Sequence, residues 1–279
     1  MEKRSDKAAE SLGFVQGFVR MCNDGWLQGW HERNGGNLSY RLTNQEVAEA
    51  RPYFGEPRSW HEVGVELPNL AGEYFLVTGS GKYMRNVILD PAANIGICEL
   101  DESGSRWRIV WGLDGGARPT SEFPTHLMNH SVRKQATDGA NRVIYHCHAT
   151  NVIALTYVLP LTDRDFSRAL WQSATECPVV FPEGVGVVEW MVPGGVDIAR
   201  ATSKKMETYQ AAIWAQHGLF VSGPDFDTAF GLAHTIEKSA EIYVKVLSCG
   251  QGIRQTITDD DLRAIAHDFG VTLNESFLD

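Results

Sequence analysis

Segments with strand character alternate with segments of helical periodicity along most of this chain, and this order restricts the fold more than any other feature of the sequence. β-Branched and aromatic residues mark the strands "NIGICEL" and "RWRIVWGL", which are separated only by the turn-forming stretch "DESGS". So short a connection predicts a β-hairpin. The interleaved elements indicate the α/β class, and the hairpins mean that the sheet need not be parallel.

Periodicity, turn residues and capping residues predict the individual elements. Phe14, Phe18, Met21 and Cys22 recur at helical spacing and predict a helix over residues 8–32 that ends at "NGGN". Residues 43–72 are rich in proline and glycine without a sustained period, which predicts long loops with one short element. No repeat or linker-like tract interrupts the pattern, so we expect one domain over residues 1–279. The other predicted strands are "LSYRL", "EYFLVTGSG", "RVIYHCHA", "PVVFP", "VGVVEWMVP", "AAIWAQHG" and "LFVSG". The other predicted helices begin at "PTSE", with Thr120 or Ser121 as N-cap, or cover about residues 150–158, 164–172, 196–210, 225–249 and 259–269, with Asp225 or Asp227 near the cap of the 225–249 helix.

Composition limits the functions that are open to the chain. A sequence of 279 residues with 43% hydrophobic residues can bury a large core. The formal net charge of -10 and the lack of a long basic run argue against nucleic acid or an anionic membrane as the main partner. Five scattered cysteines without a C-x-x-C pair indicate a reducing compartment and exclude a cysteine-based zinc ribbon. Because we find no apolar signal region and no stretch long enough to span a bilayer, we expect a cytoplasmic protein.

Two histidines stand one residue apart in "YHCHATN", at the end of a predicted strand. Side chains of a strand alternate between its faces, so His146 and His148 point to one face and Cys147 to the other. Imidazole suits Zn²⁺, and a catalytic zinc needs three protein ligands and an open position. His217 precedes a glycine at the end of another predicted strand, where a third ligand would converge. By itself, an H-x-H pair is a weak signal for a metal, and two polar residues that close a strand are the more common case.

Other residues near this motif offer competing interpretations. His126 and His130 lie four residues apart on the helix after "PTSE", a spacing that places both on one face and would also serve a metal. We prefer a surface or packing role for both. Cys147 could be a ligand or a nucleophile, but it faces away from the flanking histidines and has no activating partner evident in the sequence, so we expect a buried structural thiol.

A glutamate and two glycine-rich turns add to the histidines. Glu122 lies at the expected start of a helix, where the dipole favours an ionised carboxylate and where simple capping is the alternative role. The turns "RNGGNLS" and "VTGSGKYMR" offer backbone amides together with Asn34, Asn37, Ser80 and Lys82, which could surround a phosphate or form ordinary turns. Neither turn matches a nucleotide fingerprint. Taken jointly, a metal and a phosphate cradle imply a phosphorylated substrate whose carbonyl the ion would chelate.

Nearly the whole chain takes part in a resemblance to one protein family. The stretches that carry it are "GWHERNGGNLSYRL", "LVTGSGKYMRNVILDPAANIGI", "PTSEFPTHL", "VIYHCHATNVIALTYVL", "ATECPVVFPEGVG", "WMVPG", "QHGLFVSGP" and "FGLAHTIEKSAEIYVKV". They run collinearly from about residue 13 to 270, whereas residues 44–70 and the first dozen residues are least alike. With this set the chain resembles the class II aldolases of sugar phosphates, and among them most closely those that act on L-rhamnulose 1-phosphate. The resemblance implies a three-layer α/β/α fold with a mainly antiparallel central sheet, and a cyclic homotetramer with sites at subunit interfaces.

The resemblance also implies roles for individual residues. One Zn²⁺ per subunit would be held by His146, His148 and His217, and Glu122 would be the catalytic acid/base. The implied reaction is the reversible retro-aldol cleavage of L-rhamnulose 1-phosphate to dihydroxyacetone phosphate and L-lactaldehyde, a step of rhamnose catabolism in which zinc stabilises the enediolate. The residues implied to hold the substrate phosphate are Asn34, Gly35, Asn37, Ser80, Gly81, Thr120 and Ser121, and Glu176 would reach the site of a neighbouring subunit.

Two alternatives stay open at this point. Enzymes of the same fold that cleave fuculose phosphate or epimerise pentulose phosphates at C4 would share the metal ligands and the enediolate chemistry. The stretch "EWMVPG" favours rhamnulose phosphate over these substrates. A non-catalytic, adducin-like binding module is the alternative from another functional class, but such a module would be expected to lack the metal histidines, and all three are present here.

Overall fold

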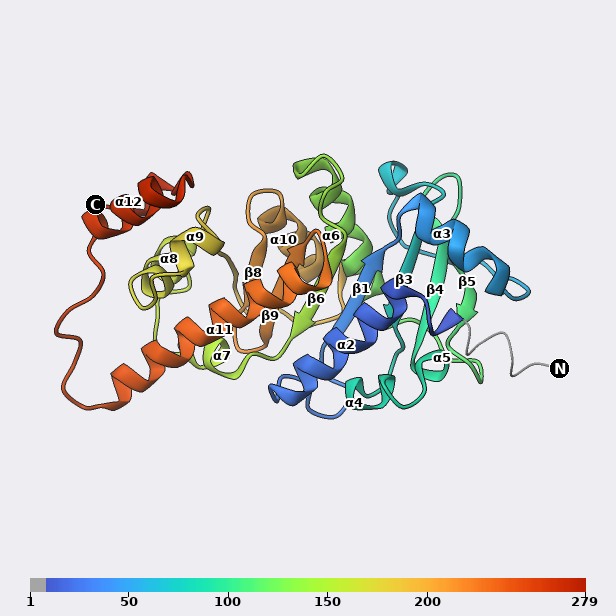
Figure 1. Ribbon diagram of the computed structural model, residues 1–279, viewed down its shortest axis with the longest axis horizontal. Coiled ribbons are helices and arrows are strands. Elements are labelled where there is room, and N and C mark those ends of the chain that lie inside the picture. The colour runs from blue at the N-terminus through green and yellow to red at the C-terminus, as the bar shows by residue number, and fades with distance from the viewer. Residues whose placement is uncertain (1–8) are drawn as a thin grey trace.

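The strands form one continuous sheet. The computed structural model describes residues 9–279, so the first residue of the predicted 8–32 helix lies outside the described residues. Among the described residues nine strands run in the order β2-β5-β4-β3-β1-β6-β9-β8-β7 (Figure 1). All neighbouring pairs are antiparallel except β7 with β8, which confirms the predicted mainly antiparallel sheet. The strands are β1 (Asn37–Arg41), β2 (His61–Glu62), β3 (Tyr74–Thr78), β4 (Ile95–Leu100), β5 (Arg106–Gly112), β6 (Val143–Cys147), β7 (Gly186–Val188), β8 (Ala211–Trp214) and β9 (Gly218–Gly223).

Helices cover both faces of the sheet, as the three-layer α/β/α prediction requires. On one face α2 and α11, which lie in front of the strands in Figure 1, pack on β1, β6 and β9 with residues such as Phe18 and Ile236. On the other face Phe123 of α6 and Ile198 of α10 belong to two smaller core clusters. The helices are α2 (Gly13–Leu27), α3 (Asn44–Ala50), α4 (Met84–Val87), α5 (Pro91–Asn94), α6 (Phe123–Ala136), α7 (Thr150–Leu155), α8 (Asp163–Trp171), α9 (Cys177–Val180), α10 (Val196–Met206), α11 (Phe226–Ser248) and α12 (Asp259–Phe269), with short 3₁₀ turns at Arg51–Tyr53, Pro68–Leu70 and Glu275–Phe277.

The predicted hairpin joins β4 to β5. The Asp101 carboxylate accepts hydrogen bonds from the backbone N–H groups of Ser105 (3.0 Å) and Arg106 (3.2 Å), which closes the turn. Beyond β5 the chain returns across the sheet, and Pro119 forms an isolated antiparallel bridge with Gly79. The hairpin therefore brings the "PTSE" segment beside the glycine turn that follows β3.

Side chains of β6 alternate between the two faces, as a strand requires. Ile144 packs into the cluster with α10, and the ring of His146 stacks on Phe220 with 4.3 Å between centroids. Tyr145 and Cys147 are buried in the opposite cluster. The prediction that Cys147 is a buried thiol facing away from His146 is confirmed, and burial raises the pKa of this thiol.

Three predicted elements differ from the structure. The stretch "PVVFP" is not a strand, because α9 begins there with Pro178 in its first turn, where the missing N–H is not needed. The first helix ends at Leu27 rather than at residue 32, since Gly29 adopts a φ of 79° and donates its N–H to the Trp26 carbonyl. Of the predicted strand "VGVVEWMVP", only Gly186–Val188 pairs with the sheet.

Capping residues were predicted with mixed success. Asp225 caps α11 as expected, accepting from the Thr228 N–H. Thr120 and Ser121 do not cap α6, whose N-cap position is Glu122.

Residues 43–72 are more regular than predicted, since they contain α3, the strand β2 and two 3₁₀ turns. A capping box at the start of α3, which pairs Thr43 with Glu46, is the signal that was missed.

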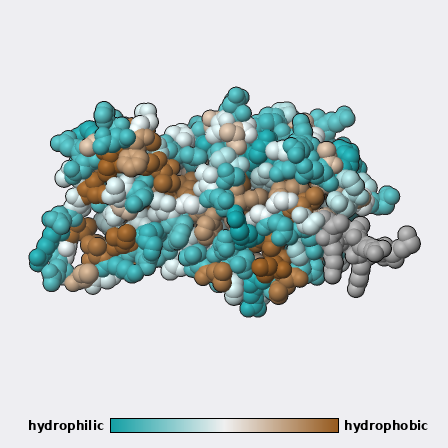
Figure 2. Space-filling model, viewed as in Figure 1, coloured by the Kyte–Doolittle hydropathy of each residue, from teal (hydrophilic) through white to brown (hydrophobic). Residues whose placement is uncertain are grey.

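The surface over these layers is mixed in polarity, with separate apolar areas (Figure 2). Among the described residues, no helix has the length and apolar character that crossing a bilayer demands.

Candidate metal centre and active site

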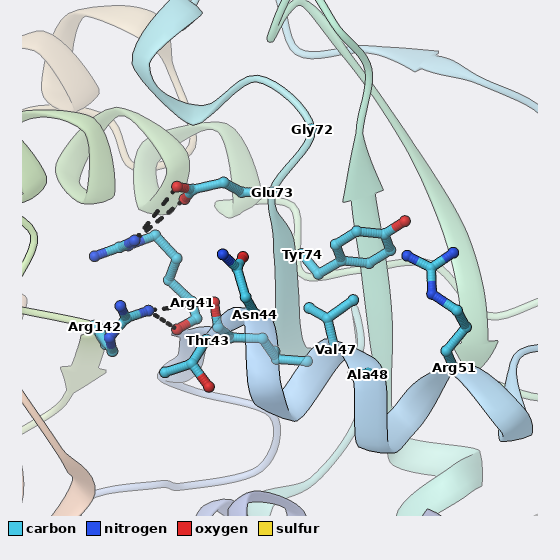
Figure 3. Close-up of a pocket in the computed structure, with 11 residues that line it drawn as sticks. Arg41, Thr43, Asn44, Val47, Ala48, Arg51, Gly72, Glu73, Tyr74 and Arg142 are labelled. Atoms are coloured by element: carbon cyan, nitrogen blue, oxygen red, sulfur yellow. Dashed lines mark hydrogen bonds and ion pairs between the residues drawn. The ribbon is translucent and has the colours of Figure 1, made fainter.

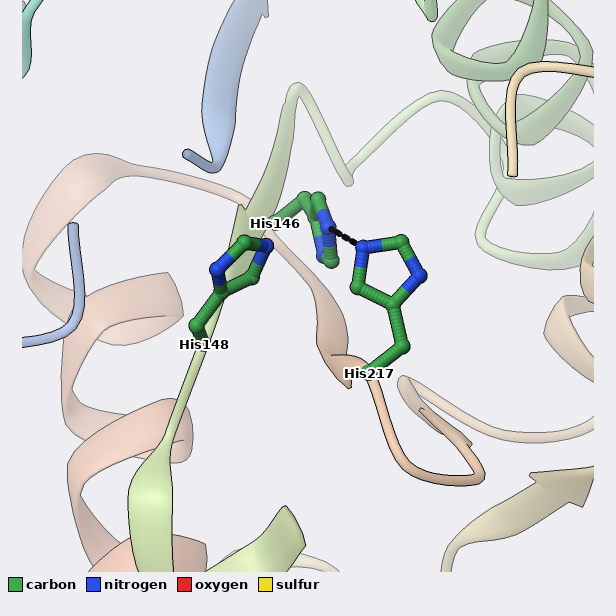
Figure 4. Close-up of side chains that lie close together, drawn as sticks. All are labelled: His146, His148 and His217. Carbon is green, nitrogen blue, oxygen red and sulfur yellow. Dashed lines mark hydrogen bonds between the residues drawn. The ribbon is translucent and has the colours of Figure 1, made fainter. Parts of the chain in front are cut away.

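Three histidines converge where β6 ends beside the turn between β8 and β9. His146 is the fourth residue of β6, His148 follows the end of that strand, and His217 lies in the β8–β9 turn. One potential ligand atom of each ring lies within 4.8 Å of the others, and Figure 4 shows the three rings facing a common centre. The structure thus brings together the three residues that were predicted to be metal ligands.

Hydrogen bonds orient two of the rings. The His146 Nδ1 lies 3.2 Å from the Leu219 carbonyl oxygen, and the His148 Nδ1 lies 2.6 Å from a Glu32 carboxylate oxygen. Both partners only accept, so each Nδ1 donates a hydrogen bond, and Nε2 is the ring nitrogen that remains for a metal ion. The Nε2 atoms of His146 and His217 are 3.3 Å apart. A donor set of imidazole nitrogens with carboxylate or carbonyl partners behind them is the chemistry of a transition-metal site.

Burial and the neighbouring rings lower the pKa of two of the three histidines, His146 and His217. Burial, followed by the neighbouring rings of His148 and His217, lowers the pKa of His146 well below its ordinary value. Burial and His148 lower the pKa of His217 to about 4. Because a metal ion competes with protons for the same nitrogen, neutral rings are ready to bind one near neutral pH.

The turn that carries His217 is held tightly. Gln216 adopts a φ of 55°, and its side-chain amide donates to the Thr156 carbonyl at 3.0 Å. A Cβ on the next residue, Gly218, would lie 2.4 Å from the Cys147 carbonyl oxygen. Only glycine allows β9 to approach the end of β6 so closely, and this approach sets His217 beside His146.

Glu122 lies next to this cluster. Asn37 pairs with His146 across β1 and β6, and its side-chain amide donates to the Glu122 carboxylate at 2.7 Å. Burial raises the pKa of Glu122, while the Asn37 hydrogen bond and the nearby His148 ring act in the opposite direction. A buried carboxyl group with a raised pKa beside a candidate metal centre is suited to proton transfer.

The three segments that contain the predicted phosphate-binding residues, around Asn37, Ser80 and Thr120, lie side by side. The Ser80 N–H donates to the Arg118 carbonyl and the Thr120 N–H to the Thr78 carbonyl, both at 2.8 Å. The Leu38 N–H, which follows the first glycine turn, donates to the Thr78 hydroxyl oxygen at 3.2 Å. The resulting cradle has exposed residues at Asn34, Ser80, Gly81 and Ser121, and buried ones at Asn37 and Thr120.

The structure places Glu176 at the surface of its own chain. It is exposed and immediately precedes α9. A cavity of about 390 Å³ opens beside the histidines, and Glu176 is not among its lining residues, which are Gly29, Glu32, His148, Thr150, Ile153, Gln216 and His217.

His126 and His130 lie in the protein core. Both are buried on α6, so the packing role is confirmed and the surface role is wrong. Their rings share the Ser39 hydroxyl, at 2.7 Å and 2.8 Å, and neither belongs to the cluster formed by the three converging histidines.

Two further residues around the site were not recognisable from the sequence. Glu32 binds His148 although 116 residues separate them in the sequence. His31 is buried, with its Nε2 2.7 Å from the Tyr145 hydroxyl and its Nδ1 3.0 Å from the Gly35 carbonyl oxygen, and so holds the first glycine turn in place. Both residues stand inside the matched stretch "GWHERNGGN", but only the strand order reveals their partners.

A second cavity, of about 440 Å³, lies at the other end of β1 (Figure 3). Its polar lining includes Arg41, Arg142 and Glu73, and the buried Arg41 guanidinium is already bonded to Glu73 and to the Gly139 carbonyl. Arg41 is four residues along β1 from Asn37, roughly 13 Å away. This cavity is therefore separate from the histidine cluster.

Comparisons with known proteins agree with this geometry. The family model described as "Class II Aldolase and Adducin N-terminal domain" matches residues 16–244. The chain belongs to this family. A rhamnulose-1-phosphate aldolase from Enterobacter sp. (strain 638) is 50% identical over 266 residues, which cover 95% of this chain and 96% of that protein. One from Mannheimia succiniciproducens is 51% identical over 93% of this chain and 95% of that protein.

Solved structures share the class II aldolase fold. A sugar-phosphate aldolase from Thermotoga maritima superposes with a TM-score of 0.71 at 30% identity, covering 85% of this chain and 95% of that one. An L-fuculose 1-phosphate aldolase matches with a TM-score of 0.60 at 20% identity over 93% and 97% of the two chains, which bears on the fold alone.

Proposed function

We propose that this class II aldolase is a lyase that cleaves L-rhamnulose 1-phosphate reversibly to dihydroxyacetone phosphate and L-lactaldehyde, as a step of rhamnose catabolism in the cytoplasm. The three-histidine cluster beside a buried glutamate supports the reaction class. The identity of 50% to rhamnulose-1-phosphate aldolases, over nearly the full length of both chains, supports the substrate. The presence of all three histidines speaks against a purely binding, adducin-like role.

The proposed cofactor is one Zn²⁺ per chain, held by His146, His148 and His217. The donor set fits, because three imidazoles converge and two of them place Nδ1 on a hydrogen-bond acceptor, which leaves Nε2 to face the ion. When bound, the ion supplies Lewis-acid stabilisation of the negative charge that develops on the ketose oxygen. No lysine nucleophile is then required.

Glu122 would move the proton at carbon. In the cleavage direction it delivers a proton to the carbon left when the C3–C4 bond breaks, and in synthesis it removes that proton from dihydroxyacetone phosphate. Its burial, its raised pKa and its hydrogen bond to Asn37 support this role. Glu176 would assist at the aldehyde oxygen from a neighbouring subunit, since it is exposed on its own chain just before α9.

The substrate phosphate would lie in the cradle of the three adjacent segments. In a protein with a net charge of -10, local amides and hydroxyls must provide the positive potential for a dianion. One hydrogen of the Asn37 amide is used by Glu122, and the other remains for an oxygen of the substrate. The proposed phosphate ligands are Asn34, Gly35, Asn37, Ser80, Gly81, Thr120 and Ser121.

We further propose that the single domain formed by residues 1–279 assembles as a homotetramer with sites at the interfaces. Leu27 at the end of α2 and Leu89 after α4 are 66% and 79% exposed. Figure 2 shows apolar surface where α2 ends near α4. Large apolar side chains gathered on a surface commonly mark a protein contact.

Metal analysis followed by an aldol-cleavage assay tests the proposal. We expect about one zinc per chain, and faster release of dihydroxyacetone phosphate from L-rhamnulose 1-phosphate than from L-fuculose 1-phosphate. A preference for L-fuculose 1-phosphate would assign that ketose as the substrate instead. Epimerisation of a pentulose phosphate at C4 without cleavage would assign a different reaction. Absence of metal from the purified protein, or no turnover of either ketose by the metal-loaded protein, would refute the proposal.

A further inference from the structure

Glu122 stands at the end of a continuous chain of buried polar side chains. Its carboxylate accepts from the Asn37 amide at 2.7 Å, and the Asn37 side-chain oxygen is hydrogen-bonded to His126 Nε2. The other ring nitrogen of His126 lies 2.7 Å from the Ser39 hydroxyl, which lies 2.8 Å from His130 Nε2. The chain thus links the proposed proton-transfer group to the middle of α6 and β1.

This chain lies in the protein interior. Glu122 and Asn37 are 8% and 6% exposed, while Ser39, His126 and His130 are between 0% and 1% exposed. Burial lowers the pKa of His126 to about 3 and the pKa of His130 well below its ordinary value. Both rings are therefore neutral and each carries a single N–H, which has to find an acceptor among its buried neighbours.

Only one direction of donation satisfies all of these groups. An ionised carboxylate can only accept, so Asn37 presents its NH₂ group to Glu122 and its oxygen to His126. His126 must then donate from Nε2 and accept at Nδ1 from the Ser39 hydroxyl. The Ser39 oxygen in turn accepts from His130 Nε2–H. Each proton position in the chain is determined by the one before it.

We propose that Ser39, His126 and His130 are positioning residues for Glu122, which act by holding the Asn37 amide with its NH₂ group toward the carboxylate. With the opposite orientation, the Asn37 oxygen would face the carboxylate, and two acceptors would repel each other. The carboxyl group would then leave the position from which it reaches the substrate carbon. This inference rests on the proposed function, since it presumes that Glu122 transfers the proton.

Ser39→Ala tests this inference, because it removes the hydroxyl that sets the His126 ring and leaves all proposed metal and phosphate ligands in place. The matched control is Ser222→Ala, which removes another buried serine hydroxyl, on β9, whose partner is the Asn141 amide. Two rates are measured on the metal-loaded, full-length proteins. One is ketose cleavage, and the other is the exchange of hydrogen between dihydroxyacetone phosphate and deuterated water, which reports proton transfer without bond cleavage.

For Ser39→Ala we expect kcat for cleavage and the exchange rate both to fall about tenfold to a hundredfold, as for a misplaced catalytic group. Metal content should stay within about twofold, and KM should rise less than kcat falls, because among the proposed phosphate ligands only the Asn37 amide depends on Ser39. Ser222→Ala should retain both rates. A second pair separates hydrogen bonding from packing: His126→Gln can still donate an N–H to Asn37 and should retain more exchange activity than His126→Leu.

Each other outcome has a definite meaning. Wild-type exchange and cleavage in a folded Ser39→Ala protein would overturn the inference, as would equal loss in His126→Gln and His126→Leu. Loss of metal in Ser39→Ala, or a rise of KM as large as the fall of kcat, would show a merely structural role of Ser39 and would also overturn the inference. If the wild-type protein neither cleaves the ketose nor exchanges hydrogen, the proposed function itself fails.

Discussion

Acid should destabilise this protein in part through His126, and replacing this residue should reveal how much. The ring is fully buried on α6, and burial lowers its pKa from 6.5 to about 3. In the unfolded chain the same ring is free to take up a proton at its ordinary pKa. Between these two values the unfolded state binds more protons than the folded state, so stability falls as the pH falls.

The size of the effect follows from the width of this window. A pKa difference of one unit corresponds to about 1.4 kcal/mol, so between pH 7 and pH 4.5 His126 alone should remove about 3 kcal/mol from the free energy of unfolding. The contribution is fully present above pH 6.5 and is lost progressively toward the folded-state pKa of about 3. Burial shifts the pKa of His130 in the same direction, so the stability that this ring loses in acid would add to the loss from His126.

Urea unfolding of metal-free wild type and His126→Gln, followed by circular dichroism from pH 7 to pH 4.5, measures this contribution. We expect the variant to lose about 3 kcal/mol less than the wild type over that range, whatever its stability at pH 7. The matched control is His267→Gln, on the exposed surface of α12, which should follow the wild-type curve. Parallel curves for wild type and His126→Gln would refute the argument that this ring is buried in its neutral form.

Three further variants probe the site. Glu122→Gln should retain metal and fold but slow ketose cleavage about a hundredfold or more. An assay of dihydroxyacetone phosphate release measures this, and an unchanged rate would mean that another residue is the acid/base. Glu32→Gln should weaken metal affinity about tenfold by replacing the carboxylate that orients His148; competition with a chelator measures this, and wild-type affinity would deny Glu32 that role. Gly218→Ala should destabilise the protein by about 1–3 kcal/mol, because the added Cβ would lie 2.4 Å from the Cys147 carbonyl oxygen, and a thermal melt identical to that of the wild type would contradict this steric argument.

The residues that face the candidate metal centre could be predicted because they sit at the ends of local elements. A period of two places His146 opposite Cys147, and the structure has the ring and the thiol on different faces of β6. His217 was recognisable by the glycine that follows it, since close approach of two backbones requires one. These inferences use only the geometry of a strand and a turn, which are properties of a few consecutive residues.

Short apolar stretches were less predictable. The β-branched residues of "PVVFP" favour a strand, but Cys177–Val180 form a helical turn that packs against α8, α11 and α12. His126 and His130 have the spacing of an exposed helical pair, yet α6 buries both under the sheet. In each case tertiary contacts override a local preference that is worth about 1 kcal/mol or less.

The sequence by itself determined the α/β class, most of the elements, and the three histidines and the glutamate that the structure brings together at the candidate metal centre. Only the tertiary structure decided which groups these side chains contact. Because β1 lies between β3 and β6, Asn37 pairs with His146 and its side chain reaches Glu122. The same arrangement joins Glu32 to His148 and encloses the chain from Glu122 to His130. The physical reason is that periodicity records which face of an element is buried, whereas strand order and register determine which buried faces meet.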